Sequence, residues 1–189
     1  MNARKSRQHE RVRSELEAYA HWFAAPDPST GGRFLAVTLF AESRSVAQVA
    51  RDMTAQFLRD TEGAAVVDNA RLAVSELVGN VVNHAVPDRP LTLPGGCRRI
   101  DVTFRMWPKW LFIGITDEDS SPPLLPLGET VSPDLAGEFI EAVLPDSGRG
   151  LLIVQHLADA VWWTPGDQGG KTVWCRFDLD DSAGGRSAW

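Results

Sequence analysis

The chain has 189 residues, of which 43% are hydrophobic, so it is long enough to form one globular domain with a sizeable core. Its formal net charge of −6 argues against nucleic acid as a direct partner. The two cysteines, Cys97 and Cys175, form no C-x-x-C pair and suit a reducing compartment, and the sequence shows neither a secretory leader nor an apolar run that could span a membrane. We therefore expect a cytoplasmic protein without direct contacts to membrane or nucleic acid.

Residues 1–32 are expected to form an extension that precedes the main domain. After a basic start, Val12, Leu16, Tyr19 and Phe23 follow one another at helical spacing, and a linker rich in Pro, Ser and Gly comes next. This pattern predicts a short amphipathic helix. Two interpretations remain open: a docking or dimer-contact element, or a terminal helix laid on the domain.

The rest of the chain mixes helices and strands. Alternating apolar and polar residues predict strands over residues 33–40, 99–105, 110–116, 160–164 and 171–179. Helical periodicity predicts a helix that begins after a capping box of Ser45 and Gln48, and further helices over about 65–85 and 150–158. Because most strands come late and are joined by hairpins, we expect an α+β fold, a two-layer α/β sandwich. Its sheet should be mixed but mostly antiparallel, with the helices on one face.

The expected domain runs over residues 33–179, and residues 180–189 are predicted to be a loose tail. Within the domain, the connection from residue 117 to residue 149 is rich in proline and unusually long. Loops of this length inside a compact domain are usually functional.

The helix predicted over residues 65–85 carries an unusual polar face. Glu76, Asn80, Asn83 and His84 lie opposite the apolar stripe, without any Lys or Arg among them. Since Asn and His are mediocre helix formers, a row of them indicates a binding role. The alternative is an amphipathic helix with an Asn-rich exposed face.

This motif resembles the N-box of the GHKL ATPase superfamily, which includes gyrase, heat-shock chaperone, histidine kinase and mismatch-repair ATPase domains. The residues that match the family pattern are Glu76, Leu77, Asn80, His84 and Ala85. The resemblance implies that Asn80 ligates Mg²⁺, that Glu76 is the general base, and that His84 lies near the nucleotide; Asn83 is expected in the same site. An Asn carbonyl is a hard oxygen ligand of the kind that Mg²⁺ prefers.

Asp117, at a predicted strand end, resembles the aspartate of the family's D-x-G-x-G motif, which accepts a hydrogen bond from the adenine amino group. Here Asp119 and Ser121 stand in place of the two glycines. The alternative for Asp117 is a turn residue that ends the strand.

Two glycine-containing motifs follow in the order that the superfamily requires. The first, which contains Gly148, Arg149, Gly150 and Leu151, resembles the box that closes the ATP lid. Its glycines would let backbone N–H groups approach phosphate at a helix N-terminus, and Arg149 would add positive charge. In the second, Gly-Gly-Lys-Thr, the resemblance places Thr172 near the nucleotide; a glycine-rich hairpin is the alternative.

Within the superfamily, Ala70–Val78 and Gly170–Trp174 most resemble the anti-sigma factor serine kinases and their single-domain actinobacterial relatives. The resemblance implies ATP and Mg²⁺ as cofactors, sequestration of a sigma factor, phosphorylation of a Ser or Thr on an anti-anti-sigma antagonist, and a homodimer. The alternative function is a catalytically weak protein-binding module, with or without nucleotide. The missing glycines and the long lid favour it.

Overall fold

The computed structural model describes residues 32–88, 96–125 and 149–179. In chain order its elements are β1 (Arg33–Phe40), α2 (Val46–Phe57), a short 3-10 helix η3 (Glu62–Val66), α3 (Val67–His84), β2 (Arg99–Trp107), β3 (Trp110–Asp117), α4 (Arg149–Leu157), β4 (Ala160–Pro165) and β5 (Lys171–Asp178). The five predicted strands are present, as are the helix predicted after Ser45 and those predicted over 65–85 and 150–158, with small differences at their ends. The helix predicted in the N-terminal extension and the tail predicted over 180–189 lie outside the described residues. No helix in the described ranges is both long and apolar enough to cross a membrane.

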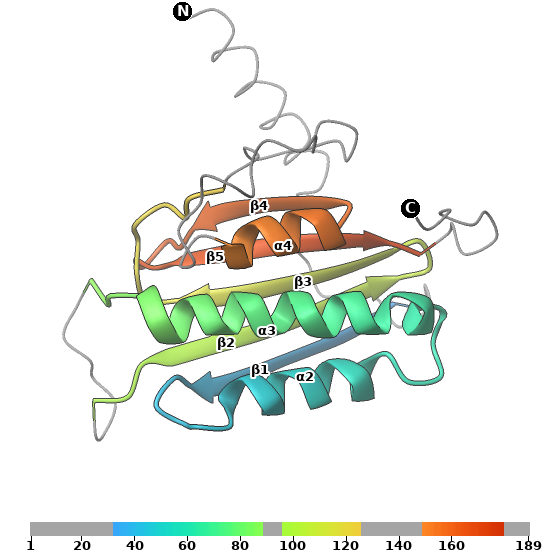
Figure 1. Cartoon of the computed structure of the whole chain (residues 1–189), viewed down its shortest axis with the longest axis horizontal. Helices are drawn as coiled ribbons and strands as arrows, with labels where there is room; N and C mark the ends of the chain where they lie inside the picture. Colours follow the sequence, from blue (N-terminus) through green and yellow to red (C-terminus); the bar gives the residue numbers. More distant parts are fainter. Residues whose placement is uncertain (1–31, 89–95, 126–148, 180–189) are drawn as a thin grey trace, which may run out of the picture.

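The strands form one sheet in the order β1-β2-β3-β5-β4. Every neighbouring pair is antiparallel, so among the described strands the sheet has none of the parallel pairing of a mixed sheet. Helices α2, α3 and α4 lie together on one face of the sheet (Figure 1). The predicted two-layer α+β sandwich is therefore confirmed.

The core lies between the helices and the sheet. On β2, Ile100, Val102 and Phe104 are completely buried and alternate with partly exposed polar residues, as expected for a strand with one face in the core. Helix α3 meets this face with its buried stripe, which consists of Ala70, Ala73, Val74, Leu77, Val78 and Val81. This packing fixes the rotation of α3 about its axis and so decides where its polar residues lie.

The predicted capping box at the start of α2 is wrong. Ser45 makes no side-chain cap and instead lies 3.3 Å from the Ser43 hydroxyl. Its backbone, at φ −103° and ψ 6°, is not in the extended conformation that most N-cap residues adopt. Gln48 donates to the Asp52 carboxylate one turn later, at 2.9 Å, rather than reaching back to the helix start.

Candidate functional site

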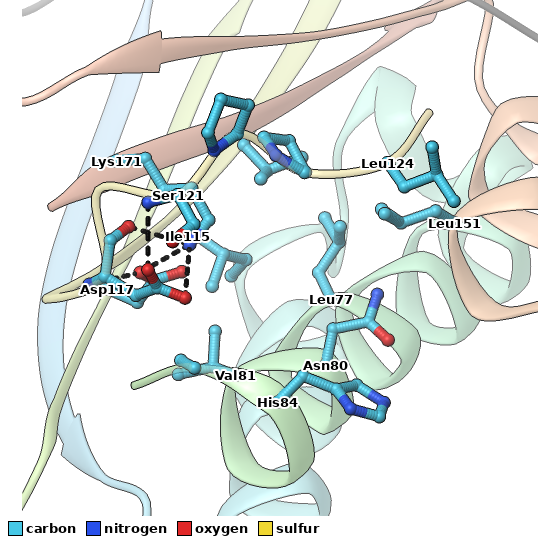
Figure 2. Close-up of a pocket in the computed structure, with 15 residues that line it drawn as sticks. Leu77, Asn80, Val81, His84, Ile115, Asp117, Ser121, Leu124, Leu151 and Lys171 are labelled. Atoms are coloured by element: carbon cyan, nitrogen blue, oxygen red, sulfur yellow. Dashed lines mark hydrogen bonds and ion pairs between the residues drawn. The ribbon is translucent and has the colours of Figure 1, made fainter. Parts of the chain in front are cut away.

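A cavity of about 320 Å³ opens between α3 and the sheet, where β3 ends and β5 begins (Figure 2). Its size lies within the range of small-molecule sites. The side chains that line it come from α3, the segment after α3, the end of β3 and the loop that follows, α4 and β5. They are Leu77, Asn80, Val81, His84, Ala85, Ile115, Asp117, Asp119, Ser121, Pro122, Pro123, Leu124, Leu151, Lys171 and Val173.

The middle of the cavity is apolar. Leu77 and Val81 come from α3, whereas Ile115 and Val173 come from neighbouring strands of the sheet. Leu151, at the start of α4, adds a further apolar side chain. Walls of this kind, with polar groups at the ends, suit a flat and largely apolar ring.

A buried charge cluster forms one end of the cavity. Lys171 is directly opposite Asp117 in the β3–β5 register, and its Nζ donates to Asp117 Oδ1 at 3.0 Å. The same Nζ donates to the Asp119 carbonyl at 2.7 Å and lies 3.4 Å from Asp119 Oδ2. Two of the three N–H donors of the ammonium group are thus engaged in hydrogen bonds, and its charge is paired with both carboxylates.

The loop after β3 is held by its own carboxylates. Asp117 Oδ1 accepts the backbone N–H of Asp119 at 2.8 Å, and Asp119 Oδ1 accepts that of Ser121 at 2.9 Å. Each bond joins an Asp side chain to the backbone two residues later, which is the geometry of an Asx turn. These turns support the loop without the glycines of the D-x-G-x-G motif. Within the described ranges, Asp117 Oδ2 has no such partner and remains available to a ligand.

The two carboxylates differ in their electrostatics. Burial raises the pKa of Asp117 above 3.8, although the Asp119 N–H and Lys171 oppose that rise. Burial also acts to raise the pKa of Asp119, but hydrogen bonds from Ser121 and Val86, together with Lys171, outweigh it and lower the pKa below 3.8. Asp117 is therefore the more easily protonated of the two, and Lys171 favours its ionised form.

A second set of contacts joins the same loop to the β4–β5 turn. The Ser120 hydroxyl donates to the Asp88 carboxylate and accepts the Gly170 N–H at 2.7 Å. Gly170 has φ +76°, and a Cβ there would lie 2.1 Å from the Asp117 carbonyl oxygen. Only glycine fits this position, because both the backbone conformation and the close approach exclude a side chain.

Glu76 and Asn80 of α3 converge with Gly150 of α4 on the other side of the cavity. A Cβ at Gly150 would lie 2.9 Å from Glu76 Oε2 and 3.2 Å from Asn80 Oδ1. Asn80 Nδ2 is buried and has no hydrogen-bond partner among the described residues. Buried amides normally have partners, so an orphaned one beside a cavity and a helix N-terminus indicates a ligand. The unpartnered N–H donors fit a phosphate oxygen, and Asn80 Oδ1 is of the ligand type that could hold the accompanying Mg²⁺.

The model of one protein family, described as the histidine kinase-like ATPase domain, matches residues 39–177. This range is most of the chain and includes α3, the charge cluster and α4. The chain belongs to this family. No curated protein matches the chain.

Only some of the residues predicted for the nucleotide site of this histidine kinase-like ATPase domain line the cavity. Asn83 is exposed and does not line the cavity. Thr172 does not line it either, because its hydroxyl pairs with that of Thr116, at 2.7 Å, on the other face of the sheet. Arg149 is exposed at the start of α4, and Gly148 lies outside the described residues. The predicted residues that do line the cavity are Asn80, His84, Asp117 and Leu151.

Lys171 was missed by sequence reasoning. The glycine motif drew attention to Thr172, but neighbouring residues of a strand point to opposite faces, so only one of the two could face the cavity. The signal was a lysine in a strand whose next inward-facing neighbours, Val173 and Cys175, are apolar. A charge at such a position needs a buried partner.

Proposed function

We propose that the protein binds ATP with Mg²⁺ in this cavity and uses it to regulate a partner protein. One observation carries the proposal: the cavity has a carboxylate acceptor, Asp117, at one end and, at the other, the amide of Asn80, whose Nδ2 has no partner in the described part of the chain. Apolar walls connect the two. Membership of a histidine kinase-like ATPase family supports ATP as the ligand.

Recognition of the base follows from the charge cluster. An adenine ring between the apolar walls would donate from its exocyclic amine to Asp117 Oδ2. Lys171 donates to Asp117 and to the Asp119 carbonyl and is paired with both carboxylates, so this end of the cavity would offer a guanine carbonyl the Asp117 carboxylate as its neighbour. Burying two acceptors against each other is unfavourable. The site should therefore prefer adenine to guanine nucleotides.

The phosphates would lie toward Asn80 and the N-terminus of α4. Asn80 Oδ1 would hold Mg²⁺, which when bound offsets phosphate charge and orients the triphosphate. The Gly150 backbone and the α4 dipole favour an anion at this place, and Arg149 adds a positive charge nearby. His84, which lines the cavity one turn beyond Asn80, would contact the nucleotide from the same helix.

We further propose protein kinase activity toward an anti-anti-sigma antagonist, with a sigma factor as the sequestered partner. Glu76 lies one turn before Asn80 on α3 and beside Gly150. It would accept the proton of a Ser or Thr hydroxyl and align that oxygen with the γ-phosphoryl group. The resemblance of Ala70–Val78 and Gly170–Trp174 to anti-sigma factor kinases supports these partners, and a homodimer stays a prediction.

A phosphotransfer assay with radiolabelled Mg·ATP and an antagonist protein tests the kinase. Glu76→Gln keeps the shape of the side chain, so ATP binding should persist while transfer falls by about 100-fold or more. Asp68→Asn is the matched control, because it removes a carboxylate that is 91% exposed on the same helix. Transfer by Glu76→Gln at the wild-type rate would contradict the role of Glu76.

The second candidate function is a nucleotide-dependent binding module without catalysis. It is favoured by Asp119 and Ser121, which replace the glycines of the adenine motif and tie the loop to Lys171 and to its own backbone. This function predicts partner binding that responds to ATP but yields no phosphoprotein. A stoichiometrically phosphorylated antagonist would exclude it.

A further inference from the structure

Asp117, in the charge cluster at one end of the cavity, has a hydrogen-bonding role that depends on its ionisation. An ionised carboxylate only accepts hydrogen bonds, whereas a protonated one also donates. Purines differ at the group that would meet it: adenine carries an amine at position 6, which donates, whereas guanine and hypoxanthine carry a carbonyl there, which accepts. The ionisation of Asp117 therefore decides which class of purine fits.

The two oxygens of Asp117 have different surroundings. Oδ1 accepts from Lys171 Nζ at 3.0 Å and from the Asp119 N–H at 2.8 Å (Figure 2). The backbone fixes both donors, because Lys171 lies opposite Asp117 in the β3–β5 register and Asp119 is two residues further along the Asx turn. In the described part of the chain these donors occupy Oδ1, so Oδ2 is the oxygen that a base would meet.

The charged groups around Asp117 come from β5, from its own loop and from α3. Lys171 and Asp119 are in contact with each other beside it, and His84 lines the cavity from α3. Glu118, between the two aspartates, is bonded to the start of β2 instead. Burial raises the pKa of Asp117, as does the charge of Asp119, while the Asp119 N–H and Lys171 oppose that rise. Lys171 is thus the cation that favours the ionised form of this buried carboxylate.

We propose that Lys171 is a positioning residue that keeps Asp117 a hydrogen-bond acceptor and so restricts the cavity to purines with a 6-amino group. This inference rests on the proposed ATP site, since it concerns how that site distinguishes adenine from 6-oxopurines. Lys171 faces oxygens rather than the base: its Nζ donates to Asp117 and to the Asp119 carbonyl and lies 3.4 Å from Asp119 Oδ2. It therefore acts on the base through Asp117.

Inosine triphosphate (ITP) is the probe, because its base differs from adenine only at position 6 and the adjacent N1. Calorimetric titration of the full chain with Mg·ATP and Mg·ITP gives the ratio of the two affinities. The wild type is expected to prefer ATP by about tenfold or more, the value of a hydrogen bond to a charged group. In Lys171→Met this preference should shrink by about tenfold, because Asp117 protonates more easily and then donates to the inosine carbonyl.

The pH dependence separates this role from a purely structural one. Acidification from about pH 8 to about pH 6 should reduce the preference of Lys171→Met for ATP further, since more Asp117 is then protonated. Protonation of His84 cancels from the ratio, because both nucleotides carry the same triphosphate. Lys171→Arg keeps the cation and should restore the preference for ATP. Lys109→Met, which removes an exposed lysine from the β2–β3 turn, is the matched control and should keep the wild-type ratio.

Asp117→Asn tests the same geometry with Lys171 in place. The amide oxygen would stay with the two donors that now occupy Oδ1, so the amide N–H groups would take the place of Oδ2 and donate to the base. This variant should bind ITP more tightly than ATP. It also decides the question if tryptophan emission shows that Lys171→Met is unfolded.

The outcomes distinguish this inference from the proposed function. A wild type that binds neither nucleotide overturns both. A wild type that prefers ATP, together with an unchanged ratio in Lys171→Met at both pH values, overturns the role of Lys171 and leaves the ATP site in place. Preference of Asp117→Asn for ATP has the same consequence.

Discussion

Lys171→Met removes the cation from between two buried carboxylates and nearly preserves the length of the side chain. Lys171, Asp117 and Asp119 are 8%, 4% and 11% exposed, and the ammonium lies 3.0 Å and 3.4 Å from the two carboxylates. Removing one partner of a buried pair costs about 3–5 kcal/mol, since the remaining charge is left without compensation. We expect the free energy of unfolding to fall by this amount. Typical domain stabilities of about 5–15 kcal/mol leave the variant folded in buffer.

Urea unfolding followed by tryptophan emission measures this loss. Adding Asp119→Asn to Lys171→Met should recover part of it, because one of the two uncompensated carboxylates is then neutral. The double variant also shows whether charge or packing causes the loss of stability, because a loss caused by poor packing of the introduced methionine would not be recovered by Asp119→Asn. A loss below about 1 kcal/mol for Lys171→Met, the value of an exposed ion pair, would show that Lys171 is not the buried counter-ion of the two carboxylates.

The loss of stability in Lys171→Met should also depend on pH. Without Lys171, the pKa of Asp117 rises further, and Asp119 loses one of the causes that lower its pKa. The folded variant then binds more protons than its unfolded chain in mildly acidic solution, so acidification stabilises it. In the wild type, Asp119 has a lowered pKa and contributes stability that is lost as pH falls. The difference in free energy of unfolding between the wild type and Lys171→Met should therefore shrink from pH 7 to pH 5. A constant difference would contradict the role of Lys171 as the counter-ion of Asp117 and Asp119.

Three glycines yield further predictions. Gly150→Ala should weaken Mg·ATP binding by about tenfold or more, because its Cβ would lie 3.2 Å from Asn80 Oδ1, where the phosphates and Mg²⁺ are proposed to bind. Gly79→Ala is the control on α3: it meets nothing within 4 Å, so calorimetry should show unchanged binding and urea unfolding a gain of about 0.5–1 kcal/mol. Gly114→Ala should lose about 1–3 kcal/mol in the same unfolding assay, since its Cβ would lie 2.6 Å from the Trp174 ring. Wild-type stability of Gly114→Ala would contradict the close packing of Trp174 over Gly114.

The secondary structure could be predicted because its signals are local. Ile100, Val102 and Phe104 alternate with polar residues within a single strand, and this alternation is enough to place β2 with one face in the core. Asn80 was found in the same way, as a polar residue that repeats at helical spacing opposite an apolar stripe. The capping box failed because Ser45 has the right side chain but not the backbone conformation that a cap requires.

The remaining features of the site depend on pairing between distant residues. Lys171 neutralises Asp117 only because β3 and β5 align in one register across 54 residues of sequence. The same register places Thr172 beside Thr116, away from the cavity. A single sequence does not encode that register in any local pattern. Sequence reasoning therefore identified the acceptor carboxylate but missed the cation that holds it.

Calorimetric titration with ATP, in the presence and absence of Mg²⁺, tests whether the cavity binds the nucleotide. The proteins are the wild type, Asn80→Ala, and Asn69→Ala as an exposed asparagine on the same helix. Mg²⁺-dependent binding is expected for the wild type and Asn69→Ala, and loss of that binding is expected for Asn80→Ala. Absence of binding by the wild type, or unchanged binding by Asn80→Ala, would contradict a Mg·ATP site at Asn80.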